Sequence, residues 1–143
     1  MIVWGGYDES TIFNSGGRYH PDLGIWSSTN MNSAPAPRFL HSTIWTGEEM
    51  LIWGGTNTQT DLADGARYDP DSDTWALINP TGAPSKREVH TAVWTDEEMI
   101  IWGGYNGTDF LRTGGRYNPV TDTWTETEPL APQARNWHTA VWT

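Results

Sequence analysis

Hydrophobic residues lie along the chain in short runs that polar and glycine-containing stretches separate. Two such runs, "HTAVWT" (90–95) and "EMIIWGG" (98–104), are rich in valine, isoleucine and tryptophan, and a tight acidic turn joins them. No window has apolar residues at the spacing of an amphipathic helix, about one turn in every 3.6 residues. Short β-rich runs bounded by turns predict strands paired as hairpins. The pattern therefore predicts an all-β fold.

The same phrases return at a fixed interval. Trp4, Trp53 and Trp102 each precede Gly-Gly, and their numbers differ by 49. The histidines at 41, 90 and 138 follow the same period, with one residue deleted between 124 and 138. Self-similarity at such a period is typical of repeat architectures. We divide the chain into three copies, residues 1–49, 50–98 and 99–143.

Each copy is predicted to contribute four strands. One consecutive set consists of 90–95, 98–104, 114–119 and a strand beginning at Trp124. We call these the first to fourth strands of a copy. A sheet that lies between two like sheets is covered on both faces, so its strands need large apolar side chains. We therefore expect nine tryptophans to be structural: Trp4, Trp26, Trp45, Trp53, Trp75, Trp94, Trp102, Trp124 and Trp142.

These residues resemble the kelch repeat. Gly-Gly closes a strand, a tyrosine follows, a tryptophan comes seven residues after the tyrosine (Tyr68 and Trp75), and Arg-x-x-His precedes the next strand (Arg87 and His90). The resemblance covers the whole chain and implies β-propeller blades, with the first strand innermost and the fourth at the rim. The copies depart from the pattern in having arginine before the tyrosine. They also number three, where kelch propellers usually have six or seven blades.

The register of the copies raises the question of closure. Met1 aligns with Met50 and Met99, at the start of a second strand, and "ARNWHTAVWT" (134–143) ends on a first strand. We expect the first strand at the C-terminus of each chain to complete the first blade of another chain. The expected fold is a propeller of four-stranded antiparallel kelch blades, three per chain, made six-bladed by a homodimer.

Alternate strand directions sort the loops onto two faces. One face holds short acidic turns, and the other, which we call the long-loop face, holds loops 7–15, 56–64 and 105–113 and loops 27–37, 77–86 and 126–134. Loops that vary on a rigid scaffold are where recognition usually occurs. The candidate ligand-binding residues are Arg38, Phe39, Arg87, Tyr105, Phe110, Arg112, Arg135 and Trp137.

His41, His90 and His138 begin the first strands and are expected at the mouth of a central channel. One histidine per copy with no accompanying carboxylate is poor metal-ligand spacing, so structural hydrogen bonding is the favoured interpretation. We predict no metal and no cofactor.

Composition excludes several functions. A formal charge of -10 disfavours binding to nucleic acid or to an anionic membrane surface. There is no cysteine for a disulfide or a thiolate metal site, and the copper radical oxidases of the kelch family need one. The N-terminus lacks the pattern of a signal peptide, and the compartment stays open.

The leading hypothesis is a non-catalytic scaffold that assembles with itself and binds a protein or glycan through the long-loop face. Two alternatives stay open. One is a sugar-converting kelch enzyme that uses the channel-mouth arginines and histidines, and the other is a purely architectural or engineered half-propeller.

Overall fold

The computed structural model describes residues 1–128 and 132–143. No helix occurs among these residues, which confirms the all-β prediction. The strands are β1 (Ile2–Trp4), β2 (Gly16–His20), β3 (Ile25–Ser28), β4 (Ser42–Trp45), β5 (Met50–Trp53), β6 (Gly65–Asp69), β7 (Thr74–Leu77), β8 (Thr91–Trp94), β9 (Met99–Trp102), β10 (Gly114–Asn118) and β11 (Thr123–Glu126).

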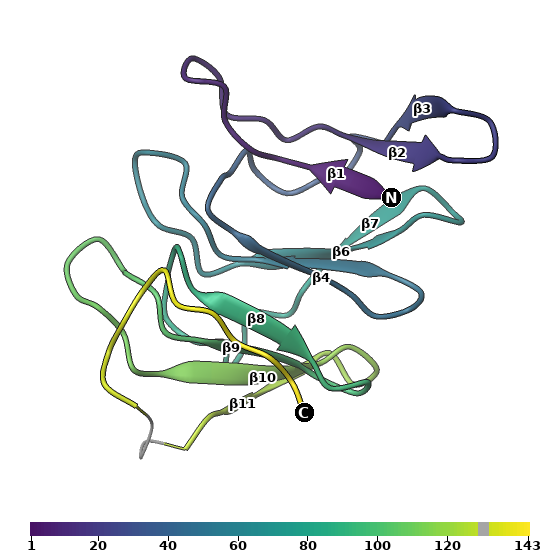
Figure 1. Cartoon of the computed structure of the whole chain (residues 1–143). Helices are drawn as coiled ribbons and strands as arrows, with labels where there is room; N and C mark the ends of the chain where they lie inside the picture. Colours follow the sequence, from purple (N-terminus) through teal and green to yellow (C-terminus); the bar gives the residue numbers. More distant parts are fainter. Residues whose placement is uncertain (129–131) are drawn as a thin grey trace.

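The strands form three antiparallel sheets that follow one another in space as they do in the sequence (Figure 1). Their orders are β1-β2-β3, β4-β5-β6-β7 and β8-β9-β10-β11, as expected for consecutive kelch blades. Residues 138–143 repeat the sequence of β8 but belong to no strand. They lie beside β8 (Figure 1), and no described strand borders them on the side where a second strand would pair.

The two complete sheets share one register. Trp53 lies opposite Ser42 and Gly65, and Trp102 lies opposite Thr91 and Gly114. The acidic hairpin turns are fixed by the threonine that precedes each of them. Thr46 and Thr95 accept hydrogen bonds on Oγ1 from the backbone N–H of the third residue ahead, at 2.9 Å in both turns. Local side-chain bonds of this kind stabilise tight turns.

The core lies between sheets. The first interface packs Trp4 against Met50, Ile52, Ala66, Tyr68 and Trp75, and the second packs Leu51 and Trp53 against Met99, Ile101, Tyr117 and Trp124. One tryptophan pair occupies each interface, with ring centroids 5.2 Å apart for Trp4 and Trp75 and 4.4 Å apart for Trp53 and Trp124. The indole N–H of Trp75 donates to Asn30 O across the interface at 2.9 Å. Adjacent sheets are therefore joined by apolar contact and by hydrogen bonds.

Not all nine tryptophans are buried. Trp4, Trp53, Trp75 and Trp124 are in the core, and Trp94 and Trp102 are partly buried. Trp26, Trp45 and Trp142 are about half exposed, which departs from the expected burial. Their exposure follows from position, because Trp26 and Trp142 lie at the two ends of the stack and Trp45 borders a gap beside β1.

The paired glycines are required by their backbone and by their surroundings. Gly54 and Gly55 have φ of +65° and +88°, a left-handed conformation that side chains disfavour. A Cβ atom would lie 2.7 Å from Arg87 O at Gly54 and 2.5 Å from Phe39 O at Gly55. A side chain at Gly54 would push away the segment before β8, and a side chain at Gly55 would push away the segment before β4.

Replacing Trp75 with alanine tests the interface as the source of stability. We expect the free energy of unfolding to fall by about 3 to 5 kcal/mol, because a cavity forms and the bond to Asn30 O is lost. Chemical denaturation measures the change. The control is Trp137→Ala, which removes an exposed indole and should cost well under that amount. Equal costs for the two variants would contradict the assignment.

Candidate functional site: the long-loop face

The loop tips of the long-loop face are held by local hydrogen bonds. Asp8, Asn57 and Asn106 each accept backbone N–H bonds from residues two and three positions ahead, at distances from 2.7 to 3.1 Å. Such Asx turns fix a loop without burying it. The three loops after the Gly-Gly pairs therefore differ in sequence, but the same kind of Asx turn fixes each of them.

Aromatic rings lie on these loops in pairs. Tyr7 stacks on Phe39 with centroids 5.2 Å apart, and Tyr105 packs on Phe110 at 5.5 Å. Phe39 exchanges two backbone hydrogen bonds with Thr56, of 2.9 and 3.1 Å, and Glu88 does the same with Tyr105. Phe39 and Tyr105 are partly buried, whereas Phe110 is 58% exposed. The sequence analysis missed Tyr7, although it follows Gly-Gly as Tyr105 does.

Trp137 lies at the inner edge of this face. Leu40, Val89 and Trp137 occupy equivalent positions with φ of 56°, 49° and 53°. Val89 N donates to Leu40 O and Trp137 N donates to Val89 O, both at 3.2 Å. This backbone chain holds Trp137 with its side chain 74% exposed. An exposed indole on a fixed backbone is a typical binding anchor.

Two of the predicted arginines are not available to a ligand. Arg38 and Arg87 are fully buried, and each donates to two backbone carbonyls of the next sheet, one just after its second strand and one just before its third strand. The acceptors are Gly54 O at 3.1 Å and Asp64 O at 3.0 Å for Arg38, and Gly103 O and Thr113 O for Arg87. The carboxylate of Asp64, which sequence reasoning missed, lies 3.0 Å from Arg38. We therefore remove Arg38 and Arg87 from the candidate ligand-binding residues.

The remaining two arginines are exposed. Arg112 borders a cavity of about 420 Å³ that also contains Glu126 and Glu128. Arg135 donates through Nε to Gln133 O at 2.9 Å. The loop that contains Gln133 includes residues 129–131, which lie outside the described residues. The exposed part of the face thus carries Phe110, Arg112, Arg135 and Trp137.

Two of the three channel-mouth histidines, His90 and His138, bond to hydroxyl groups of the preceding blade. Ser42 Oγ lies 2.8 Å from His90 Nε2, and Thr91 Oγ1 lies 2.9 Å from His138 Nε2. A hydroxyl residue follows each histidine in the sequence, at 42, 91 and 139, which was the available signal for this contact. Burial lowers the pKa of His41 to about 4, with a smaller contribution from Arg38. Burial, Arg87 and the neighbouring histidines lower the pKa of His90 to about 3.

His41 and His90 are therefore neutral at pH 7 and part of the packing. Within the described residues no three His, Asp or Glu side chains come together as a metal site would require.

The same part of the structure has no helix that could cross a membrane.

The buried histidines predict that stability depends on pH. Their folded pKa values lie below the ordinary value of 6.5, so from pH 6.5 down to about 4 the unfolded chain binds protons that the folded chain does not. The free energy of unfolding should therefore fall across this window, by about 2 to 4 kcal/mol. Denaturation at a series of pH values measures the slope. His90→Gln should flatten it and His20→Gln, at an exposed position, should not; equal slopes for both variants would contradict the explanation.

Comparison with protein families agrees with this architecture. The KLHDC2/KLHL20/DRC7 Kelch-repeats domain matches residues 1–143, which is the full length of the sequence. No curated protein matches the chain. The match spans all three sheets, including the Gly-Gly pairs, the buried arginines and the interface tryptophans. The chain therefore belongs to the kelch-repeat family.

Proposed function

We propose that this chain is a non-catalytic interaction scaffold that binds a protein through its long-loop face. The supporting observation is that Phe110 and Trp137 expose large aromatic surfaces on loops whose backbones are fixed by hydrogen bonds. Rigid aromatic side chains bind at a low cost in conformational entropy and commonly dominate interface energy. Membership of the kelch-repeat family supports the same function.

The sugar-converting alternative has less support. It needs the channel-mouth arginines, yet the guanidinium groups of Arg38 and Arg87 are buried and bound to carbonyl oxygens. It also needs a histidine that exchanges protons, and burial holds the pKa of His90 at about 3, far from the value suited to acid–base catalysis near neutral pH. These two features favour a scaffold.

We also propose that two chains assemble into a six-bladed ring. The supporting observation is that equivalent positions differ sharply in exposure. Trp26 is 53% exposed where Trp75 is 7% exposed, and Met1 is 70% exposed where Met50 is 3% exposed. Exposed apolar surface of this kind marks an interaction site, and the free edge of β1 adds unpaired backbone groups.

The mass in solution tests the assembly. One chain has a mass of 16.0 kDa, so light scattering coupled to size exclusion should give about twice that mass for the dimer. Because association would cover the exposed Trp26, the dimer should persist at low micromolar concentration. A monodisperse species of one chain mass would contradict the proposed ring.

Ligand selection tests the binding face. Peptides selected from a random display library on the immobilised protein should bind about tenfold or more weakly to Phe110→Ala than to the unmodified chain. The matched control is Glu97→Ala, in an acidic turn on the face opposite the long-loop face. This variant should bind the peptides as the unmodified chain does. Calorimetry measures the affinity of each variant for the selected peptides.

A glycan array run with the same variants separates the two ligand classes. Glycan binding that Phe110→Ala weakens would assign the face to glycans instead of proteins. Ligands of either class that depend on Glu97 and not on Phe110 would contradict the assignment of the face. An assembled chain that binds neither class would leave the architectural alternative.

A further inference from the structure

Both internal junctions between sheets are built from the same polar contacts. Arg18 Nη1 donates to Pro70 O and Arg67 Nη1 donates to Pro119 O, each at 2.7 Å. Arg38 and Arg87 reach the Gly-Gly ends of the next sheet, as described above. A tryptophan pair completes each junction. The repetition defines the contacts that any further junction of this kind would use.

The third sheet presents the donor half of such a junction. Arg116 occupies the position of Arg18 and Arg67, and its side chain is 46% exposed. Arg135 occupies the position of Arg38 and Arg87. Its Nε bond to Gln133 O repeats the bonds from Arg38 Nε to Ala36 O and from Arg87 Nε to Ser85 O. Arg135 is therefore already held in the conformation in which the two buried arginines bind their acceptors.

The first sheet presents the acceptor half. Counting back one period from Pro70 reaches Pro21, and counting back from Gly54 and Asp64 reaches Gly5 and Ser15. Gly5 N donates to Ser15 O at 3.0 Å, as Gly54 N does to Asp64 O, so the carbonyl groups of this corner have the geometry of the internal acceptors. Trp26 is the counterpart of Trp75 on the same uncovered face.

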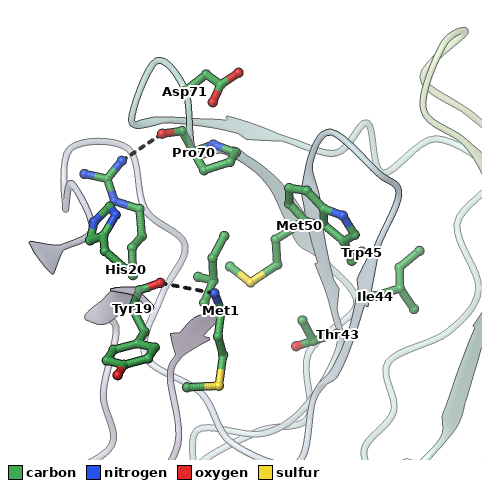
Figure 2. A pocket seen from close by; sticks show the side chains of 11 residues that line it. Met1, Tyr19, His20, Thr43, Ile44, Trp45, Met50, Pro70 and Asp71 are labelled. Carbon is green, nitrogen blue, oxygen red and sulfur yellow. Dashed lines mark hydrogen bonds between the residues drawn. The ribbon is translucent and has the colours of Figure 1, made fainter. Parts of the chain in front are cut away.

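A cavity beside β1 lies where a neighbouring first strand would pack. It has a volume of about 640 Å³ and lies between β1–β2 and β4–β5, with Ile2, Tyr19, Trp45 and Met50 in its wall (Figure 2). In the next interface the equivalent region is occupied by Ile44, which packs on the buried cluster there. The counterpart of Ile44 in the last copy is Val141.

The C-terminal segment, residues 138–143, exposes Val141, whose counterpart Ile44 fills the equivalent region in the internal interface. Ala140 and Trp142 face the third sheet, where they line a cavity with Val93, Ile100 and Trp102. Val141 points the other way and is 81% exposed. The segment therefore packs on its own third sheet as β8 packs on the second, and its opposite side is free. It lies at the far end of the stack from β1 of the same chain (Figure 1), and β1 of a second copy would offer it the strand edge that β9 offers to β8.

We infer that Arg135 and residues 139–142 form a docking element for β1 of a second copy, in a defined register. Thr139, Ala140, Val141 and Trp142 lie opposite Trp4, Val3, Ile2 and Met1 of that copy, as Thr91–Trp94 lie opposite Trp102–Met99. Arg135 donates to Gly5 O and Ser15 O, and Arg116 donates to Pro21 O. This inference rests on the proposed homodimer and specifies how it is joined.

The new junction lacks one contact that both internal junctions have. Asp73 and Asp122 accept a hydrogen bond from a backbone N–H of the preceding sheet's loop, Asn30 N at 2.9 Å and Asn79 N at 3.0 Å. The equivalent residue in the first copy is Gly24. The docked junction therefore lacks this bond and depends more strongly on Arg135.

Engineered disulfides test the register, and the chain offers a clean background because it has no cysteine. Thr95 N donates to Glu98 O, so by alternation Ala92 and Ile101 are a non-hydrogen-bonded pair, in which opposite side chains approach most closely. Ala140 and Val3 are the equivalent pair. One chain carrying Val3→Cys and a differently tagged chain carrying Ala140→Cys should form a mixed disulfide dimer when they are co-refolded and oxidised.

The matched control replaces Ala140→Cys with Val141→Cys. This side chain points to the opposite face of the strand, so the yield of mixed disulfide with Val3→Cys should be many times lower. Equal yields, or a higher yield with Val141→Cys, would overturn the register.

Substitution of the arginine tests the docking element without a disulfide. Arg135→Ala should raise the dissociation constant of the dimer roughly tenfold or more, because two charge-assisted hydrogen bonds to carbonyls are lost. The control is Arg112→Ala, which removes an exposed arginine of the same face and should leave the dissociation constant unchanged. Circular dichroism confirms that both variants keep the β fold. Equal dissociation constants for both variants would overturn the role of Arg135.

The outcomes separate this inference from the proposed assembly. A dimer by mass that gives neither the mixed disulfide nor the effect of Arg135→Ala would keep the homodimer and overturn this way of joining it. A chain that is monomeric by mass and gives no mixed disulfide would overturn both.

Discussion

The contact between adjacent sheets is the interaction on which the rest of this structure depends. A sheet of three or four short strands has two faces and cannot cover either of them by itself, so each must pack against a neighbour. Tryptophan fills the wide interface, and a buried indole removes on the order of 200 Å² from water. The Gly-Gly pairs allow the loops to approach, since a Cβ atom at Gly55 would lie 2.5 Å from Phe39 O.

The same contact explains how a charged residue can be buried between the sheets. Removing an arginine from water is costly unless its N–H groups find acceptors. Arg87 finds them in Gly103 O and Thr113 O, carbonyls at the end of β9 and just before β10, and burial lowers its pKa to about 10, so it stays charged. The guanidinium thereby ties one sheet to the next, and the loop that contains it becomes part of the scaffold. This rigidity supports the proposal that the neighbouring loop tips take part in recognition.

The residues of the two proposed surfaces are thus separated by position. Inside the stack, residues that recur in every copy, such as Trp53, Arg87 and His90, face other sheets. Residues that differ between copies, such as Phe110 and Trp137, face solvent. The two ends of the stack present junction residues of the first kind, such as Trp26. Self-association is therefore proposed for the ends of the stack, and ligand binding for the loops that carry Phe110 and Trp137.

The sequence by itself determined the period, the strands, the tight turns and the close approach at Gly-Gly, because each depends on residues near one another in the chain. It also indicated that recurring tryptophans form the core. It could not distinguish Trp26 from Trp75, which have the same place in the repeat but are 53% and 7% exposed. It placed Arg38 and Arg87 among ligand-binding residues, whereas their side chains are fully buried. Burial depends on which sheet lies alongside, and only the tertiary structure decides that neighbour.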